Sequence, residues 1–261
     1  LLPLLLPFLP LLLPLLLPLL GWSTLRHLLF AMVLLTLVVN LLKAGIGWPR
    51  PFHLQPELAR QSAQGFGMPS SHAASTLLYW GLLLGWLPAL RAWQGALLAL
   101  LLAGVAGLAR VWLGVHFLSD VVAGLALGAL LLALRAPLAK LAARPLPWAG
   151  LLIASALSAW LTQSTALAGL AMFTLGLVSG NLLSLERSPT PALPAALLTL
   201  AGGLVVAGLL FLVPALTSSS LLILAGQGWL FGCLGFWLSA GLWWSLSAIR
   251  HGARTGRSTP R

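Results

Sequence analysis

The stretch from Trp93 to Pro137, WQGALLALLLAGVAGLARVWLGVHFLSDVVAGLALGALLLALRAP, decides the class of this protein. It contains two apolar runs, 93–113 and 117–137, and each is about 20 residues long, which is enough to cross a bilayer as a helix. Backbone polar groups inside a bilayer must find partners within their own segment, so such runs form helices. Where the two runs meet, the stretch carries Arg110, His116 and Asp120. It therefore predicts two membrane-spanning helices with a polar junction.

The composition of the whole chain agrees with this interpretation. Of the 261 residues, 60% are hydrophobic and 7% are charged, against about 25% charged in an ordinary soluble domain. The 14 basic and 3 acidic residues could not coat a packed body of this size in water. A disordered chain is excluded, because it would be rich in polar and charged residues. The single cysteine, Cys233, allows no intrachain disulfide, and no cysteine–histidine cluster predicts a zinc site.

Nine apolar stretches in the chain meet the length criterion for a span. They predict an all-α fold, a polytopic integral membrane helical bundle with about nine transmembrane helices. The expected spans are 1–20, 28–46, 72–89, 93–113, 117–137, 147–162, 165–184, 192–214 and 221–248. Prolines at positions 3, 7, 10, 14 and 18 would kink the first stretch. That stretch is interpreted as a kinked span or an altered start, and a signal peptide is less favoured because a basic start and a cleavage site are missing.

The connections between alternating spans carry unequal positive charge. Ten basic residues fall on one side: Arg26, Arg91, Arg135, Lys140, Arg144, Arg187, Arg250, Arg254, Arg257 and Arg261. Four fall on the other side: Lys43, Arg50, Arg60 and Arg110. Because the side richer in Lys and Arg is cytoplasmic, the net charge of +11 is read as an orientation signal rather than a nucleic-acid surface. We expect a multi-pass protein of the cell (inner) membrane with a cytoplasmic C-terminus and an extracytoplasmic 47–71 loop.

The residues that could carry chemistry gather on the expected outer side. Asp120 begins a span and His116 lies four residues before it, so the two would share a helix face. The same side also carries three cations, a second histidine and two serines: Lys43, Arg50, Arg110, His72, Ser70 and Ser71. Three cations against one carboxylate leave a surplus of positive charge, which phosphate oxygens would complement. The alternatives are a structural His–Asp pair and cations that reach the interface individually, and the latter explains Arg60 well.

Three segments carry a family resemblance. Lys43-Ala-Gly-Ile-Gly-Trp-Pro-Arg50-Pro51 has a lysine, six residues, an arginine and a proline, and Pro69-Ser70-Ser71-His72 is similar to a proline-serine-glycine-histidine element. In the third segment, five residues separate Arg110 from His116 and three separate His116 from Asp120. In order and spacing, these segments resemble the three signatures of the type 2 phosphatidic acid phosphatase superfamily, which includes glucose-6-phosphatase and the vanadium haloperoxidases. The resemblance covers residues 28–137. Ser71 replaces the usual glycine, and Ala109 replaces a frequent serine.

The resemblance implies a phosphatase that works through a phosphohistidine and needs no cofactor or metal. His116 would be the nucleophile, Asp120 would hold its other ring nitrogen, and His72 would protonate the leaving oxygen. Five residues would bind the phosphate: Lys43, Arg50, Ser70, Ser71 and Arg110. The residues within and beside these motifs resemble those of the sphingosine-1-phosphate phosphatase and dolichyl diphosphatase branches. The expected activity is therefore hydrolysis of a lipid phosphate or diphosphate.

Several functions share these features. The substrate could belong to the undecaprenyl diphosphate, phosphatidylglycerol phosphate, phosphatidate or sphingoid phosphate class, and a soluble phosphate ester is a further alternative. A lipid phosphotransferase would use the same phosphohistidine. A non-enzymatic lipid-binding or transport protein with a relict pocket is the third interpretation, and the intact His72, His116 and Asp120 argue against it.

The interpretation divides the chain into four parts. They are a Leu/Pro-rich span and connection (1–27), a phosphatase core (28–137), a four-helix membrane extension (138–249) and a basic cytoplasmic tail (250–261). The extension carries no candidate catalytic cluster, so we expect it to be structural, to shape the lipid entrance or to form a homodimer contact, and a transport role is less favoured. The expected partners are a lipid phosphate and the bilayer, with no nucleic acid.

Overall fold

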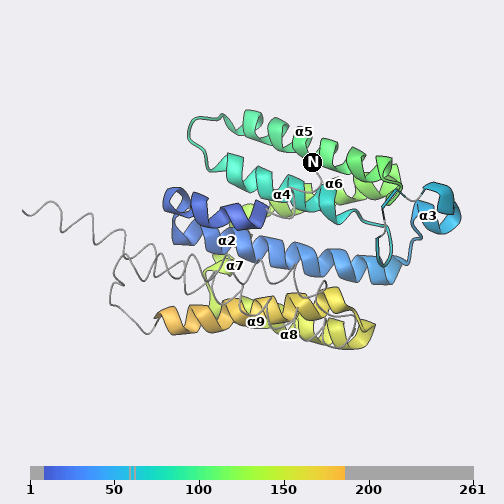
Figure 1. Cartoon of the computed structure of the whole chain (residues 1–261). Helices are drawn as coiled ribbons and strands as arrows, with labels where there is room; N and C mark the ends of the chain where they lie inside the picture. Colours follow the sequence, from blue (N-terminus) through green and yellow to red (C-terminus); the bar gives the residue numbers. More distant parts are fainter. Residues whose placement is uncertain (1–8, 59, 62, 186–261) are drawn as a thin grey trace, which may run out of the picture. The chain divides into compact units, whose positions relative to one another are not determined.

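A computed structural model of the chain describes residues 9–58, 60–61 and 63–185. In these residues every regular element is helical, which confirms the all-α prediction for this part (Figure 1). The elements are α2 (Leu9–Ile46), α3 (Pro51–Leu54), the 3-10 turn η2 (Pro56–Leu58), α4 (Ser71–Gly85), α5 (Ala92–Trp112), α6 (Leu118–Ala133), α7 (Arg135–Ala142), α8 (Pro145–Thr162) and α9 (Thr165–Leu185). The expected spans 192–214 and 221–248, the tail 250–261 and Cys233 lie outside the described residues.

The described chain falls into two compact units. The first runs from Ser23 to Arg144, and the second includes the beginning of α2 together with α8 and α9. The first unit contains all eight candidate site residues, and it extends beyond the expected core boundary at residue 137 to include α7. The site is therefore built within the first unit.

Helix α2 differs from the expected pattern of two spans joined by a connection. It runs without interruption from Leu9 to Ile46, through the 21–27 stretch that was expected to lie between spans. The last proline of the leucine-rich start is Pro18, and no proline follows within the helix. Each residue after Pro18 can therefore donate its backbone hydrogen bond, and Gly21 alone is not enough to end a helix.

Helix α6 ends earlier than the expected 117–137 span. It stops at Ala133, and α7 continues at an angle of 65°. Pro137 explains the position of the break, because a continuous helix would direct its ring against the carbonyl of Ala133, four residues earlier. In the first turn of α7 the same proline is tolerated.

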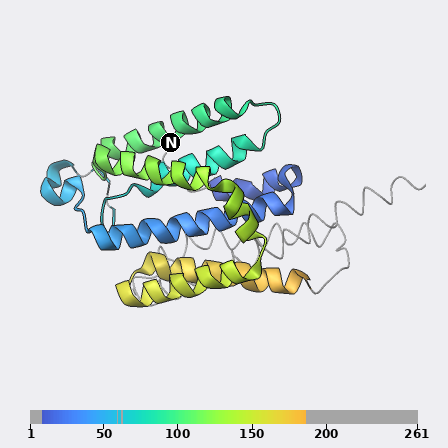
Figure 2. The same ribbon diagram turned by 180° about the vertical axis from the view of Figure 1, so that it is seen from behind.

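Helix α4 packs against both α5 and α6 (Figures 1 and 2). The contact with α6 is made at backbone distance by Gly124 and Gly128, which are four residues apart. A Cβ atom on Gly128 would come within 2.8 Å of the Ala74 carbonyl oxygen, and one on Gly124 would overlap the Ser70 carbonyl. Small residues at this spacing let membrane helices approach closely. The approach sets the start of α4 against the first turns of α6.

The two ends of the first unit carry different polar residues. At one end, here called the site end, α2 and α5 finish and α4 and α6 begin, at Ile46, Trp112, Ser71 and Leu118. The four cations that were expected on one side of the membrane lie at or beside this end: Lys43, Arg50, Arg60 and Arg110. At the opposite end, here called the far end, His27 of α2 packs against Trp86 just after α4, with ring centroids 5.6 Å apart.

The lengths of the described helices support a membrane protein. Three are long and apolar enough to cross a bilayer, within Ser23–Leu54, Ala92–Trp112 and Pro145–Thr162, and the bent pair α6–α7 makes a fourth if it counts as one span. Helix α4 has 15 residues, fewer than the ~20 of a typical span. The prediction of about nine spans is therefore not confirmed within the described residues.

The second unit contains the hairpin of α8 and α9, which pack against each other. Its buried hydroxyls bond to their own helices: Ser155 Oγ donates to the Leu151 carbonyl at 2.7 Å, and Thr174 Oγ1 donates to the Leu170 carbonyl at 2.7 Å. These two polar groups are therefore satisfied locally and do not form a second site.

Candidate active site

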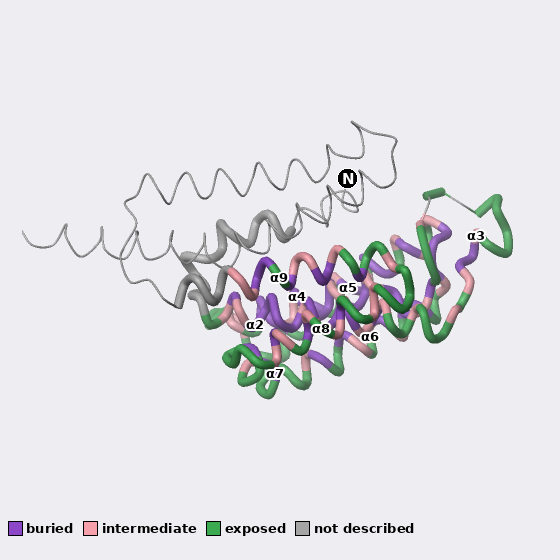
Figure 3. The backbone as a smooth tube through the Cα atoms, turned by 90° about the horizontal axis from the view of Figure 1, so that it is seen from below, coloured by how far each residue is buried: buried purple, intermediate pink, exposed green. Residues whose placement is uncertain are grey.

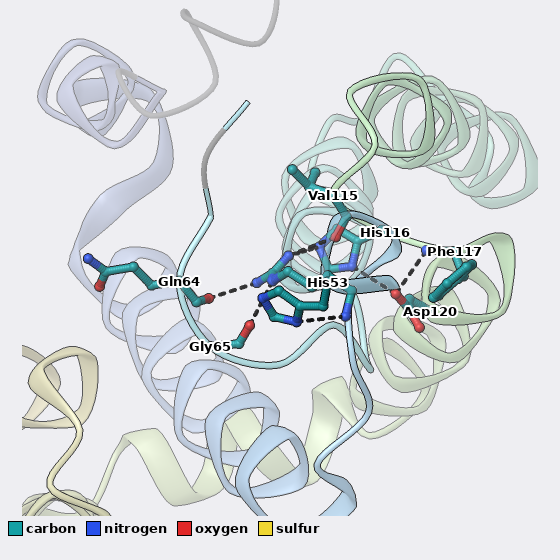
Figure 4. Close-up of polar contacts among 8 residues, drawn as sticks. His53, Gln64, Gly65, Val115, His116, Phe117 and Asp120 are labelled. Carbon is teal, nitrogen blue, oxygen red and sulfur yellow. Dashed lines mark hydrogen bonds and ion pairs between the residues drawn. The ribbon is translucent and has the colours of Figure 1, made fainter. Parts of the chain in front are cut away.

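The centre of the site is a buried pair, His116 and Asp120. Asp120 lies in the first turn of α6, where its Oδ2 atom accepts hydrogen bonds from the backbone N–H of Phe117 at 3.0 Å and from His116 Nδ1 at 3.1 Å (Figure 4). The two residues are 2% and 0% exposed. Because a carboxylate can only accept, His116 carries its proton on Nδ1 and a lone pair on Nε2.

The pair forms in a different way from the one that the spacing suggested. His116 precedes α6, whose N-cap is Phe117, so the two side chains do not share a helix face. Their contact arises because Asp120 turns back towards the N-terminus to accept the Phe117 N–H, and this places its Oδ2 beside the imidazole. The predicted contact is confirmed, and the geometry behind it is that of a helix N-terminus.

Arg50 contacts the other ring nitrogen of this histidine. Its Nη1 lies 3.5 Å from His116 Nε2. The buried guanidinium also donates to three backbone carbonyls, those of Gly65 (2.8 Å), Val115 (2.8 Å) and Gln64 (2.9 Å) (Figure 4). A guanidinium has five N–H donors; three go to these carbonyls and one to His116 Nε2, so one remains for a ligand. Arg50 thus ties the 47–71 loop to the segment before α6, contacts Nε2, and has one further N–H for a ligand.

Burial affects the protonation of the nucleophilic candidate. Desolvation lowers the pKa of His116 below the ordinary value of 6.5, and the hydrogen bond to Asp120 acts in the opposite direction. The lowered pKa keeps the imidazole neutral at pH 7, which is the state in which Nε2 has its lone pair.

Arg110 is held by a residue that the sequence analysis did not single out. It lies in the last turn of α5 and is 8% exposed, and its Nη1 donates to Gln61 Oε1 at 3.0 Å. Gln61 belongs to no motif and carries no charge, so only its place in the long 47–71 loop could have drawn attention to it. The contact orients the guanidinium, and its buried Nε has no hydrogen-bond partner.

The start of α4 completes the site. The backbone N–H of Ser70 donates to the Asp120 carbonyl at 2.8 Å, which attaches this turn to α6. Ser70 Oγ and His72 Nδ1 are buried without a hydrogen-bond partner, as is Asp120 Oδ1. With Arg110 Nε, the site has four buried polar atoms that lack a hydrogen-bond partner. Buried polar groups are normally satisfied, so this group of atoms fits a polar ligand.

Electrostatic interactions show that the predicted residues lie together. The charges of Arg110, His116, Lys43 and Arg50 all act on His72. Lys43, in the last turn of α2, interacts with the charges of Arg50, Asp120 and Arg110. Ser71 begins α4 between Ser70 and His72. The three sequence segments are thus brought to one place, with three cations around one carboxylate.

Two glycines allow the backbone to approach other groups closely around the site. Gly114 has a φ of +70°, and a Cβ atom there would overlap the Leu58 carbonyl. A Cβ atom on Gly67 would lie 2.8 Å from Asp120 Oδ2 and 3.4 Å from the Pro49 carbonyl oxygen. Gly67 therefore lets the 47–71 loop pass directly beside the Asp120 carboxylate.

Comparison with known proteins gives one positive result. The family model described as the PAP2 superfamily matches residues 24–142, which nearly coincide with the compact unit from Ser23 to Arg144. All eight candidate site residues lie within the match. No curated protein and no solved structure matches the chain.

Proposed function

We propose, from the match of residues 24–142 to the PAP2 superfamily model, that the protein is a membrane phosphatase that hydrolyses a lipid phosphate or diphosphate through a phosphohistidine. Members of the family are phosphatases, which suggests a hydrolase. One observation carries the proposal: buried Asp120 holds His116 Nδ1, and the lone pair on Nε2 faces Arg50 Nη1 at 3.5 Å. A nucleophile, its orienting group and a phosphate-binding cation are thus in contact.

The chemistry follows from these contacts. His116 Nε2 attacks phosphorus and forms a P–N bond while the P–O bond to the leaving group breaks. Asp120 stabilises the positive charge that develops on the imidazole, and His72, which enters the step in its protonated form, gives that proton to the leaving oxygen. Water then attacks the phosphohistidine, His72 takes a proton from that water, and His116 leaves with its electron pair. Phosphate is released and both histidines return to their first state.

The donors around the pair suit a phosphoryl group. The remaining N–H group of Arg50, the unpartnered Nε of Arg110 and the Oγ of Ser70 can all donate to its oxygens. Lys43 adds a further positive charge. Donors that are already in place stabilise the transition state without reorganisation. Among the described residues no group of three or more His, Cys, Asp or Glu is arranged to hold a metal ion.

The site's position supports a lipid substrate. It lies where four helices begin or end, in a unit that contains helices long enough to cross a bilayer. A phosphate at this level can be attached to a chain that stays in the membrane. The unequal charge of the expected connections supports an extracytoplasmic position for this end, and on that basis we propose that the substrate is a lipid phosphate of the outer leaflet.

The test is phosphate release by the purified full-length protein from a panel of lipid phosphates and diphosphates in detergent. With a phosphate-labelled substrate, an alkaline quench should trap labelled protein, because a phosphohistidine is lost in acid and survives in base. His116→Ala is expected to abolish both release and labelling. Release from that variant at the wild-type rate would contradict the mechanism. Transfer of the label to an added lipid alcohol in place of water would identify a phosphotransferase.

A further inference from the structure

Arg60, the cation at the site end that belongs to none of the three signatures, lies against the end of α5. Its guanidinium carbon Cζ is 4.2 Å from the centroid of the Trp112 ring, and its backbone N–H donates to the Leu113 carbonyl at 3.3 Å. Leu113 is the C-cap of α5, and carbonyls at the end of a helix have no partner within it. Arg60 thus closes the end of α5 and places its charge over an aromatic ring.

Three residues of the 47–71 loop contact the end of α5 in the opposite chain order. The contacting pairs are Leu58 with Gly114, Arg60 with Leu113 and Trp112, and Gln61 with Arg110. The last of these is the hydrogen bond of 3.0 Å from Arg110 Nη1 to Gln61 Oε1. These loop residues therefore run antiparallel to the end of the helix, and Arg60 is held directly beside the residue that contacts the site.

Helix α5 has a buried face and an exposed face, and the loop contacts both (Figure 3). Arg110 is 8% exposed and shares the buried face with Gly107. Trp112 is 71% exposed and lies in one stripe with the exposed Leu108. The guanidinium of Arg60 lies over the exposed ring, outside the phosphate site. Any effect of Arg60 on the reaction must therefore pass through another residue.

Gln61 is the residue through which Arg60 can act. Gln61 is exposed, and its long side chain has several rotatable bonds, so holding its amide against Arg110 costs conformational entropy. The two contacts of Arg60 fix the backbone directly before Gln61 and reduce this cost. The hydrogen bond from Arg110 to Gln61 in turn orients a buried guanidinium whose Nε has no partner in the site. Trp112 is thus connected through Arg60 and Gln61 to a phosphate donor.

We propose that Arg60 and Trp112 form a clamp that holds Gln61 against Arg110, and that Arg60 is a positioning residue for the phosphate site. The inference rests on the proposed function and deepens it, because it assigns part of the phosphate affinity to residues outside the three signatures. The clamp requires a cation at position 60 and an aromatic ring at position 112. Lysine and phenylalanine at these positions should therefore preserve it.

A simpler account is that both side chains only anchor the protein at the membrane surface. Trp93, in the first turn of α5 and 61% exposed, provides a matched control at the other end of the same helix. Loss of an anchor should have the same effect in Trp93→Leu and Trp112→Leu. Loss of the clamp should appear in Trp112→Leu alone.

The experiment measures the dissociation constant of inorganic phosphate by calorimetry and kcat/KM for a lipid phosphate, with full-length proteins in one detergent. The proteins are the wild type, Arg60→Ala, Arg60→Lys, Trp112→Leu, Trp112→Phe, Trp93→Leu, Gln61→Ala and the double variant Arg60→Ala with Gln61→Ala. The thermal unfolding midpoint of each protein is measured beside the two constants, so that a loss of folding is recognised.

Arg60→Ala and Trp112→Leu should each weaken phosphate binding and lower kcat/KM by about threefold to fivefold, the effect of one cation–π contact. Arg60→Lys, Trp112→Phe and Trp93→Leu should stay near the wild-type values. In the Gln61→Ala background, Arg60→Ala should cause no further loss, because the residue through which Arg60 acts is already removed.

The outcomes separate this inference from the function on which it rests. An equal loss from Arg60→Ala with and without Gln61 would overturn the proposal, since Arg60 would then act independently. Equal losses in Trp93→Leu and Trp112→Leu would overturn it in favour of an anchor. If the wild type binds phosphate but hydrolyses no ester, the proposed function fails and the binding constants still decide whether the clamp exists. If the wild type does neither, both proposals fail.

Discussion

Each end of the first unit contains a buried histidine, and the two histidines have different surroundings. At the site end, His116 is 2% exposed and contacts Asp120 and Arg50. At the far end, His27 is 7% exposed, packs against the ring of Trp86, and its Nε2 atom has no hydrogen-bond partner. Burial favours the neutral form of both rings. Only the first has a carboxylate that fixes its tautomer and a cation in contact with its other nitrogen, so burial alone does not make a reactive histidine.

The largest expected effect separates these two histidines. His116→Ala should lower phosphate release by about a thousandfold or more. His27→Ala removes a histidine of similar burial from the far end and should retain activity within about twofold, because distant sites act independently. Phosphate release and the thermal unfolding midpoint of both variants would be measured together. Loss of release in His27→Ala without unfolding would show that the far end contributes to the chemistry.

The second prediction tests what the carboxylate adds. Asp120→Asn should lower kcat/KM by about a hundredfold to a thousandfold, because the asparagine no longer fixes the tautomer or stabilises the imidazolium. Activity falls as the pH drops through the lowered pKa of His116, since the protonated ring cannot attack. Asp120 acts to raise that pKa, so its removal should move the acid limb of the kcat/KM profile to lower pH. The substrate titrates identically in both proteins. A limb that moves upwards would contradict the assignment.

The third prediction concerns His72 as the proton donor. His72→Ala should reduce hydrolysis of an alkyl phosphate by about a hundredfold. With p-nitrophenyl phosphate the loss should be only a few-fold, because that leaving oxygen needs little protonation. The ratio of the two losses is the measurement. An equal loss for both substrates would indicate that His72 binds or positions the phosphate and does not act as an acid.

The smallest expected effect tests the support of Arg110 by Gln61. Gln61→Ala should lower kcat about tenfold, because it removes a hydrogen bond to a charged group. Gln61→Glu keeps an acceptor and should restore most of the rate. Gln64 is the matched control, since its contact with Arg50 uses the backbone carbonyl, and Gln64→Ala should leave kcat/KM near the wild-type value. Equal losses in the Gln61 and Gln64 variants would show a general disturbance of the loop.

Part of the site could be predicted because it is encoded locally. His116 and Asp120 are four residues apart, so one turn of chain brings them together, although at a helix N-terminus rather than on a helix face. The roles of the eight candidate residues stay predictions until the variants above are measured. The contacts of Gln61 could not be predicted, because its partner is 49 residues away in sequence. The three carbonyls that occupy Arg50 have no sequence signature either, since every residue carries a carbonyl.

The sequence by itself predicted a helical membrane protein with three segments that resemble phosphatase signatures, and the described helices support that prediction. Hydrophobic runs and their interruptions are local properties, and they set most of the described helices to within a few residues; the exceptions are α2, which runs through the expected 21–27 connection, and α6, which ends early at Pro137. Only the tertiary structure decided how the segments meet. Gly67 passes against the Asp120 carboxylate, and Trp48 and Leu118 form one cavity although 70 residues separate them in the chain. The reason is physical: such contacts depend on the packing of helices and the path of a loop, and neither leaves a periodic pattern in the residues that it joins.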